Sequence, residues 1–408
     1  MIQAFILRFL KRRHFWRYAT FSEVAELYAS RTMRLFALRL ASIFTSIYLY
    51  QIGYSLTFIA FFWASFYLLK VVFAWPSARL AAWWGPKHGA LLSNIVSASS
   101  MLLLIFVSHP TYGIYALIGW CVMQGFSGCL YDLCYLIDFS KVKSMQHAGK
   151  EIGFMNIFEK IANGLSPLVG GLIAFWAGPH AVMLISAILF LLSTIPLFQT
   201  GEPTTVNRRL QFRGFPWRTT WRSFVAETAV GYDVFVTATA WSLFITVVVF
   251  AANKGENDIY AEVGAVTSVA MLASLVASYV YGKLIDRRRG RQLLIVSTIL
   301  NSMVHAGRPF VTTPLGVVYS NIANEVATTG FSMAFLRGMF DTADLSGRRI
   351  EYLLIIEMVV NLGAASSATL LAVLLLFMDD VLSMQLFFAV SAVITLLIAT
   401  PRFVLYRR

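Results

Sequence analysis

The sequence predicts an all-α membrane protein with twelve transmembrane helices, arranged as two pseudo-symmetric six-helix bundles. The first observation is composition: the 408 residues are 58% hydrophobic and 13% charged, with a mean hydropathy of +0.69, whereas soluble domains carry roughly 25% charged residues. The second is the presence of about twelve apolar segments long enough to cross a hydrocarbon core of about 30 Å. The third is an internal repeat at nearly half the chain length, which indicates a duplication of one unit.

The apolar segments follow one another with short breaks. They lie at 31–51, 54–82, 86–108, 110–138, 149–177 and 179–199, and then at 222–252, 259–285, 290–307, 311–340, 348–377 and 381–404. The longest polar stretch separates these two sets of six. The predicted organisation is therefore an N-terminal cytoplasmic amphipathic or basic segment (1–30), a first bundle (31–199), a cytoplasmic linker (200–221) and a second bundle (222–408). Within the first segment, residues 2–17 fit a helix on the membrane surface or a basic tail that only fixes topology.

Positive charge alternates between successive loops. The loops QIGYS, SHPTYG, AGPH and MDD carry almost no Lys or Arg, with Lys254 and Arg308 as exceptions, and the intervening loops carry most of them. Because Lys and Arg concentrate in cytoplasmic loops, the protein is expected to be multi-pass in the cell (inner) membrane with both termini cytoplasmic. The same bias accounts for the net charge of +13, so nucleic acid is not an expected partner.

Three short matches indicate the internal duplication. They are Glu159-x3-Asn163 with Glu357-x3-Asn361 (357−159 = 198), Gly149-Lys150-x-Ile152 with Gly347-Arg348-x-Ile350 (347−149 = 198), and Asp138-Phe-Ser140 with Asp344-Leu-Ser346 (344−138 = 206). Their common order predicts that the two halves arose from one unit.

The loop after the eighth apolar segment carries a recognisable motif. It reads YGKLIDRRRGRQ, in which Gly282, Leu284, Asp286, Arg287, Gly290 and Arg291 resemble the G-x-x-x-D-R-x-G-R motif of the major facilitator superfamily. Gly290 stands one residue too far from Asp286. The first half has the motif spacing, with Ala78, Ala82, Trp83, Gly85 and Lys87 at its positions, so its acidic and basic members are missing. The resemblance spans roughly 31–405 and implies the two-bundle fold of this superfamily and a transport function.

In that superfamily the motif contacts an acidic residue at the cytoplasmic end of the fourth or tenth helix. Asp138 and Asp344 stand at these ends here. The resemblance therefore suggests that an Arg287–Asp344 pair holds the cytoplasmic side closed. The alternative is that the arginines only enforce topology.

A second resemblance lies in the fifth apolar segment. Gly153-x8-Ala162-x3-Ser166-Pro167-x2-Gly170-Gly171 is similar to a pattern of antiporters in the superfamily, with Ala and Ser replacing two glycines. Small residues four apart allow close helix approach, and Pro167 kinks a helix; ordinary helix packing would explain the same residues. Cys121 occupies the position where proton-coupled members often carry Arg, which weakens the argument for proton coupling.

Ionisable residues inside a bilayer are costly and usually face a bundle interior or water. Asn156, Glu159, Asn163 and Ser166 share one helical face, whereas Lys160 points about 100° away and is expected to snorkel towards the cytoplasm. Glu159 and Glu357, with Asn163 and Asn361, are expected near the cytoplasmic side of a central cavity. They would serve as hydrogen-bonding gate residues, as protonation sites, or as structural helix-end contacts.

Other polar residues are candidates for contacts with substrate or ions. The fourth and tenth helices border the cavity in this superfamily, and Asp233 and Arg39 could pair across it. The candidates are Asp132, Asp233, Arg39, Gln124, Asn324 and Glu325.

Enzymatic motifs are missing from the sequence. It has no G-x4-G-K-[ST], H-E-x-x-H or G-x-S-x-G pattern, its six histidines are scattered, and its three cysteines lie in one apolar segment. No enzyme activity, cofactor, metal or disulfide is therefore predicted.

The leading functional prediction is a secondary active transporter that works by alternating access, exporting an amphipathic compound by proton antiport. The expected partners are a small-molecule substrate, protons and the lipid bilayer, with the protein as a monomer. Uptake or facilitated diffusion of a small metabolite is the first alternative. A non-transporting membrane sensor or scaffold is the second, because the first-half motif is degraded.

Overall fold

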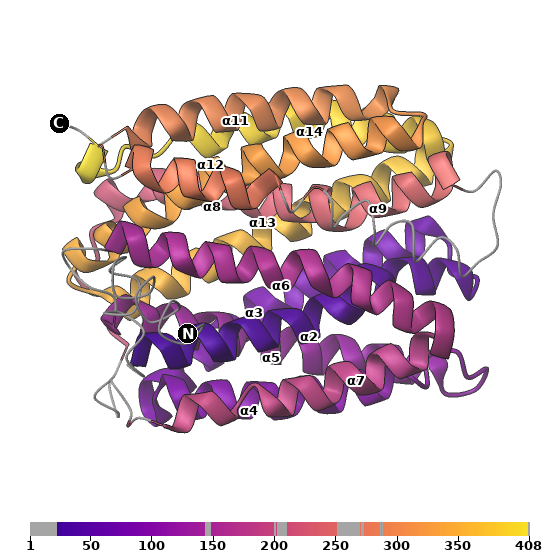
Figure 1. Cartoon of the computed structure of the whole chain (residues 1–408), viewed down its shortest axis with the longest axis horizontal. Coiled ribbons are helices and arrows are strands. Elements are labelled where there is room, and N and C mark those ends of the chain that lie inside the picture. Colours follow the sequence, from indigo (N-terminus) through magenta and orange to yellow (C-terminus); the bar gives the residue numbers. More distant parts are fainter. Residues whose placement is uncertain are drawn as a thin grey trace, which may run out of the picture.

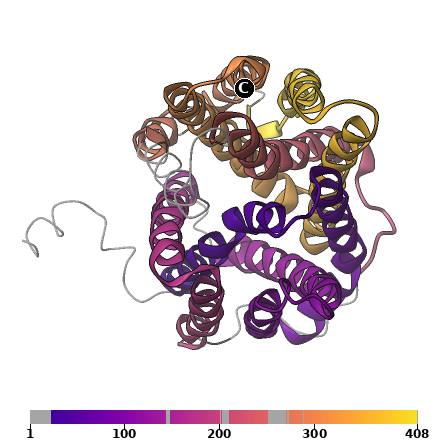
Figure 2. The same ribbon diagram turned by 90° about the vertical axis from the view of Figure 1, so that its right-hand side faces the viewer.

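The computed structural model describes residues 23–142, 148–199, 201, 210–250, 270, 273–285, 287 and 289–406. These residues form helices joined by turns and contain no strand. The helices run side by side along the long axis of the molecule (Figure 1), and the view along them shows a single bundle (Figure 2). The surface helix considered for 2–17 falls outside the described residues, as do residues 200 and 202–209 of the predicted linker.

The first half contains six long helices. They are α2 (Glu23–Gln51), α3 (Leu56–Trp84), α4 (Pro86–Leu104), α5 (Gly113–Val142), α6 (Ala148–Ala177) and α7 (Pro179–Leu192), the last continued by a 3₁₀ turn (Ile195–Phe198). Two of the tight connections use Gly followed by Pro. Gly85 and Gly178 adopt φ values of +93° and +81°, which Gly tolerates without strain, and Pro86 and Pro179 then begin the next helix, where no amide donor is needed.

The second half also supplies six helical segments. They are α8 (Trp217–Phe235) continued through a π-helical turn (Val236–Ala240), α9 (Trp241–Phe244) and a second π-helical turn (Ile245–Phe250); a helix at Ala273–Ile285; α11 (Gly290–Gly307) with a 3₁₀ turn (Arg308–Phe310); α12 (Pro314–Leu345); α13 (Arg349–Phe377); and α14 (Asp380–Thr395) with its 3₁₀ extension (Leu396–Ala399). Together with the first half, this gives the twelve predicted helices within the described residues.

Seven of the described helices are long and apolar enough to cross a membrane. The helices that miss this criterion include α6 and α12, which carry Glu159, Lys160 and Glu325. Their lower hydropathy reflects polar residues that face the interior of the protein, as described below.

The two halves meet mainly along α3 and α13, with further contacts of α13 with α5, α6 with α12, and α2 with α9. Figure 1 shows α2–α7 on one side and the second half on the other. Within the second half, α8 and α13 approach at backbone contact. A Cβ on Gly231 would lie 1.8 Å from the Val360 carbonyl oxygen, and one on Gly363 would lie 1.9 Å from that of Thr228. Only glycine permits such an approach.

Apolar clusters join the halves towards both ends of the bundle. At the end predicted to be cytoplasmic, Phe139 of α5 packs on Phe340 of α12, with ring centroids 5.4 Å apart. At the other end, one continuous buried cluster includes residues of both halves, and Tyr67 of α3 contacts Phe235 of α8 at 6.5 Å. Polar side chains gather between these clusters.

Candidate functional site

A cavity of about 430 Å³ lies between the two halves. This volume falls within the roughly 300–1,000 Å³ of small-molecule sites. α2 and α6 form one wall, and α8, α9, α12 and the Arg308 turn form the other. Its charged and amide-bearing lining consists of Arg39, Glu159, Lys160, Asn163, Asp233, Arg308, Asn321, Asn324 and Glu325.

The α6 wall presents Glu159, Lys160 and Asn163. Glu159 and Asn163 share a helical face, as the sequence predicts. The prediction that Lys160 snorkels to the cytoplasm is wrong: its Nζ lies 2.7 Å from the Glu325 carboxylate of α12, in the opposite half. α12 of the second half packs close to the face of α6 that carries Lys160, so the Glu325 carboxylate is within hydrogen-bonding distance of the ammonium.

A chain of alternating charges runs from the cavity wall across the interface. The Glu159 carboxylate accepts a hydrogen bond from Arg31 at 2.9 Å, and Arg31 also bonds to Asp132 at 3.1 Å. Lys70 then connects Asp132, at 3.5 Å, with Glu357 of the second half, at 3.4 Å. The Glu357 carboxylate also accepts a hydrogen bond of 2.7 Å from the Asn361 side chain. Five helices, α6, α2, α5, α3 and α13, are thereby connected through ion pairs.

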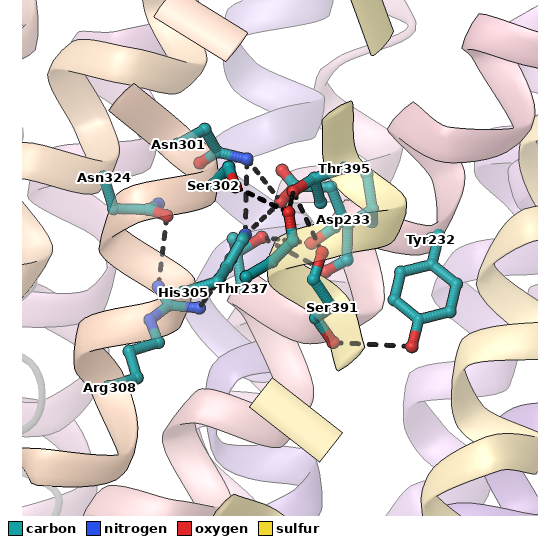
Figure 3. A network of polar contacts seen from close by, with 12 residues as sticks. Tyr232, Asp233, Thr237, Asn301, Ser302, His305, Arg308, Asn324, Ser391 and Thr395 are labelled. Carbon is teal, nitrogen blue, oxygen red and sulfur yellow. Dashed lines mark hydrogen bonds and ion pairs between the residues drawn. The ribbon is translucent and has the colours of Figure 1, made fainter. Parts of the chain in front are cut away.

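On the opposite wall, Asp233, His305 and Arg308 form a buried row (Figure 3). His305 Nε2 lies 2.6 Å from the Asp233 carboxylate, and Arg308 Nη1 lies 3.0 Å from His305 Nδ1. A guanidinium can only donate hydrogen bonds, so Nδ1 accepts and Nε2 carries the proton that it donates to Asp233. His305 and Arg308 are 0% and 1% exposed. The row therefore places a neutral imidazole between an arginine and a carboxylate.

Trp241 and two asparagines hold this row in place. Arg308 donates to the Asn324 amide oxygen at 3.1 Å and lies over the Trp241 ring at 4.6 Å. The Trp241 indole N–H donates to Asn321 at 2.6 Å. Trp241 stands between the two π-helical turns, and such turns often occur at functional sites.

The structure brings six predicted contact and coupling residues to the cavity: Arg39, Glu159, Asn163, Asp233, Asn324 and Glu325. The proposed pairing of Arg39 with Asp233 is wrong, because Asp233 bonds to His305 and Asn301 of its own half. Asp132 lies in the charge chain and not in the cavity lining. Gln124 is 3% exposed and accepts a hydrogen bond from Ser100 at 2.8 Å, which is a packing role.

The predicted cytoplasmic pair is not formed. Asp344 pairs with Arg349 at the start of α13, at 2.5 Å, whereas Arg287 is exposed and has no ion pair with any described residue. Asp286 lies outside the described residues. Because Arg349 is only five residues from Asp344, the turn at Gly347 brings them together.

The other motif residues have structural surroundings that can be described. Lys87 is buried and pairs with Glu26 of α2 at 3.3 Å, and Asp138 is also buried. Gly290 packs against the Tyr406 ring, Gly282 has only ordinary contacts, and Arg291 is exposed. The small-residue face of α6 is buried, and α6 packs on α2; this face comprises Ala162, Ser166, Pro167, Gly170 and Gly171. A gating role for these residues stays a prediction.

Sequence reasoning missed Arg31, Lys70, His305, Arg308 and Trp241. Lys70 carried a usable signal, since a lysine within the apolar run FYLLKVVFAW marks an interior-facing position. The spacing of His305 and Arg308, three residues apart, also places them on one helical face. Trp241 carried no comparable signal.

Comparison with known proteins agrees with this architecture. The family model described as Major Facilitator Superfamily matches residues 27–336. Among solved structures, the nucleoside transporter NupG matches with a TM-score of 0.66 at 14% identity, covering 95% of this chain and 99% of that one. A point mutant of NupG matches with a TM-score of 0.66 at 13% identity, covering 93% and 98%. No curated protein matches in sequence. At these identities the structural matches concern the fold.

Proposed function

The chain belongs to the major facilitator superfamily, and on this premise we propose that it is a secondary transporter moving a small, polar, hydrogen-bonding solute by alternating access. The observation that carries the proposal is the polar cavity between the two halves. Substrate sites of such transporters lie near the bilayer midplane at the interface of the repeats. The apolar clusters towards both ends of the bundle are the contacts that rocking of the halves would open and close.

The lining chemistry favours a polar solute over an amphipathic one. Asn163, Asn321 and Asn324 offer amide donors and acceptors, and charged groups stand on both walls. Apolar drug-like ligands bind in sites that are mostly hydrophobic, and burying these amides and charges under an apolar ligand would leave them unsatisfied. The expected substrate is therefore a hydrophilic metabolite and not the amphipathic compound that the sequence suggested. NupG is titled a nucleoside transporter, so nucleosides are sensible neutral members of a test panel.

The direct test is flux into proteoliposomes. Radiolabelled polar solutes, including uridine, sugars and hydroxy acids, would be compared with amphipathic dyes. We expect saturable uptake of a polar solute that is lost when Asn324→Leu places an apolar side chain on the wall. Arg213→Gln, at an exposed position, is the control. Flux of dyes only would contradict the polar-solute proposal, and absence of all flux would favour a non-transporting sensor or scaffold.

Direction and coupling are tested in the same vesicles. The buried small-residue face of α6 supports proton antiport, because this pattern resembles that of antiporters. Antiport predicts that a pH gradient drives solute and protons in opposite directions. The topology proposed for the protein places both of its termini on the cytoplasmic side. Co-directional movement would identify symport, and indifference to the gradient would identify facilitated diffusion.

A further inference from the structure

Among the described residues, one cation of the cavity lining has neither a hydrogen bond nor an ion pair. Arg39 lines the cavity from α2, and among the described residues it makes no hydrogen bond and no ion pair. Its Nε atom is inaccessible to solvent and has no acceptor. Glu159 and Glu325 act on Arg39 electrostatically, but their carboxylates are held by Arg31 and Lys160.

Every other charged side chain of the lining has a partner in the described structure. Lys160 and Glu325 pair with each other at 2.7 Å, and Glu159 pairs with Arg31 at 2.9 Å. Asp233 and Arg308 are joined through His305. Arg39 therefore differs from all of them.

A second unpartnered group lies in the same cavity. The Asn163 side chain lines the cavity, and its buried amide oxygen has no hydrogen-bond donor among the described residues. Asn163 stands on α6, which packs on α2. The cavity thus presents an unused cationic donor and an unused neutral acceptor on the same half of the protein.

Uncompensated charges and polar groups in a membrane interior are costly. We propose that the solute supplies the missing partners, and that it is a hydroxycarboxylate whose carboxylate binds Arg39 and whose hydroxyl donates to Asn163. This inference rests on the proposed function. The planar guanidinium suits a carboxylate because it can donate two parallel hydrogen bonds. A single unpaired cation matches a singly charged carboxylate, whereas a phosphate dianion would leave a charge unbalanced.

The test measures binding to the purified full-length protein in nanodiscs. Binding is detected as a ligand-induced rise in the unfolding temperature. The probes are glycerate, gluconate and quinate, each paired with its neutral primary amide, together with glycerol 3-phosphate and uridine. At least one hydroxycarboxylate should bind about tenfold or more tightly than its amide, as expected for a charge-assisted hydrogen bond. Arg39→Gln should abolish that preference, and Arg39→Lys should keep part of it.

Two further variants separate recognition from folding. Arg213→Gln makes the same chemical change at an exposed site and should leave the preference intact. Asn163→Ala should weaken gluconate binding and leave hexanoate, which has no such hydroxyl, unchanged. Unfolding temperatures without ligand identify any variant that is simply destabilised, and Arg39→Lys then carries the test.

The contrary results are distinct. Equal binding of acid and amide, unchanged preference in Arg39→Gln, or no stabilisation by any hydroxycarboxylate would overturn the inference. Tighter binding of glycerol 3-phosphate than of glycerate would overturn the assignment to a carboxylate. Uridine flux that is independent of Arg39 would leave the proposed transport function standing while removing this inference. Tight hydroxycarboxylate binding that depends on Arg39, without flux of any solute, would support the binding site and contradict the proposed transport function.

Discussion

The ion pair between Lys160 and Glu325 bridges the two halves at the cavity, so breaking it should change the balance between conformational states. Lys160→Gln leaves the Glu325 carboxylate without its 2.7 Å partner. Glu325→Gln likewise leaves the Lys160 ammonium without its charged partner. Glu325→Gln keeps the size of the side chain, and Lys160→Gln keeps a hydrogen-bond donor on a side chain one atom shorter, so the lost quantity is mainly the charge interaction.

The magnitude follows from the exposure of the two side chains, which are 15% and 17% exposed. Breaking a fully buried pair costs about 3–5 kcal/mol, whereas an exposed pair contributes about 0–1 kcal/mol. An intermediate loss of about 2 kcal/mol is expected for each single variant in the state that contains the pair. That loss corresponds to a shift of roughly thirtyfold in the equilibrium towards states in which the halves are apart at this position.

The assay measures distances between spin labels at the ends of α6 and α12 by pulsed electron resonance, alongside transport rate. Each single variant should raise the population with a longer distance, and Lys160→Glu combined with Glu325→Lys should restore the original distribution. A double-mutant cycle then gives the coupling energy. Additive effects of the two changes, or an unchanged distance distribution in both single variants, would refute the reasoning.

Three further predictions concern other parts of the molecule. Gly231→Ala should lower the unfolding temperature, because the new methyl group meets a backbone oxygen of α13 at 1.8 Å and overpacking costs about 1–3 kcal/mol. The control is Gly307→Ala, since a Cβ there meets nothing within 4 Å. Equal unfolding temperatures of the two variants would contradict the prediction. Arg31→Gln should reduce transport more than Glu159→Gln, because it removes the partner of two carboxylates and not of one; the opposite ranking of initial rates would argue against the charge chain. Trp241→Phe should weaken solute binding about fivefold through loss of one hydrogen bond of about 1 kcal/mol, and Trp241→Ala should weaken it further. If both variants bind the solute with the dissociation constant of the unchanged protein, Trp241 does not contribute to the site.

The helices and the polar face of α6 could be predicted because both depend on local sequence. Runs of apolar residues fix the spans to within a few residues at most ends, and the spacing of Glu159 and Asn163 places both on one face. The partner of Lys160 could not be predicted in this way. It comes from α12, 165 residues away in the chain, and no local pattern indicates which helix packs against that face.

The Asp233–His305–Arg308 row shows a different limit. The sequence places His305 and Arg308 at the end of an apolar segment, where charged residues usually reach water. The structure continues α11 as a 3₁₀ turn, and Arg308 stacks over the Trp241 ring with 1% of its surface exposed. Desolvation of an arginine depends on aromatic rings and hydrogen-bond acceptors that other helices supply. Hydropathy along one segment contains no information about either.

The duplicated carboxylates show how a repeated sequence acquires unequal roles. Glu159 and Glu357 are equivalent in the repeat, yet Glu159 lines the cavity and pairs with Arg31 of its own half, whereas Glu357 is 4% exposed and pairs with Lys70 across the interface. The difference arises from their cationic partners, which are not repeated: at the same offset, positions 229 (31+198) and 268 (70+198) are Ala and Ser. Both cations of the charge chain therefore belong to the first half. Loss of Lys70 should consequently affect contact between the halves, and loss of Arg31 should affect the cavity wall, although the carboxylates that they hold occupy matching positions of the predicted repeat.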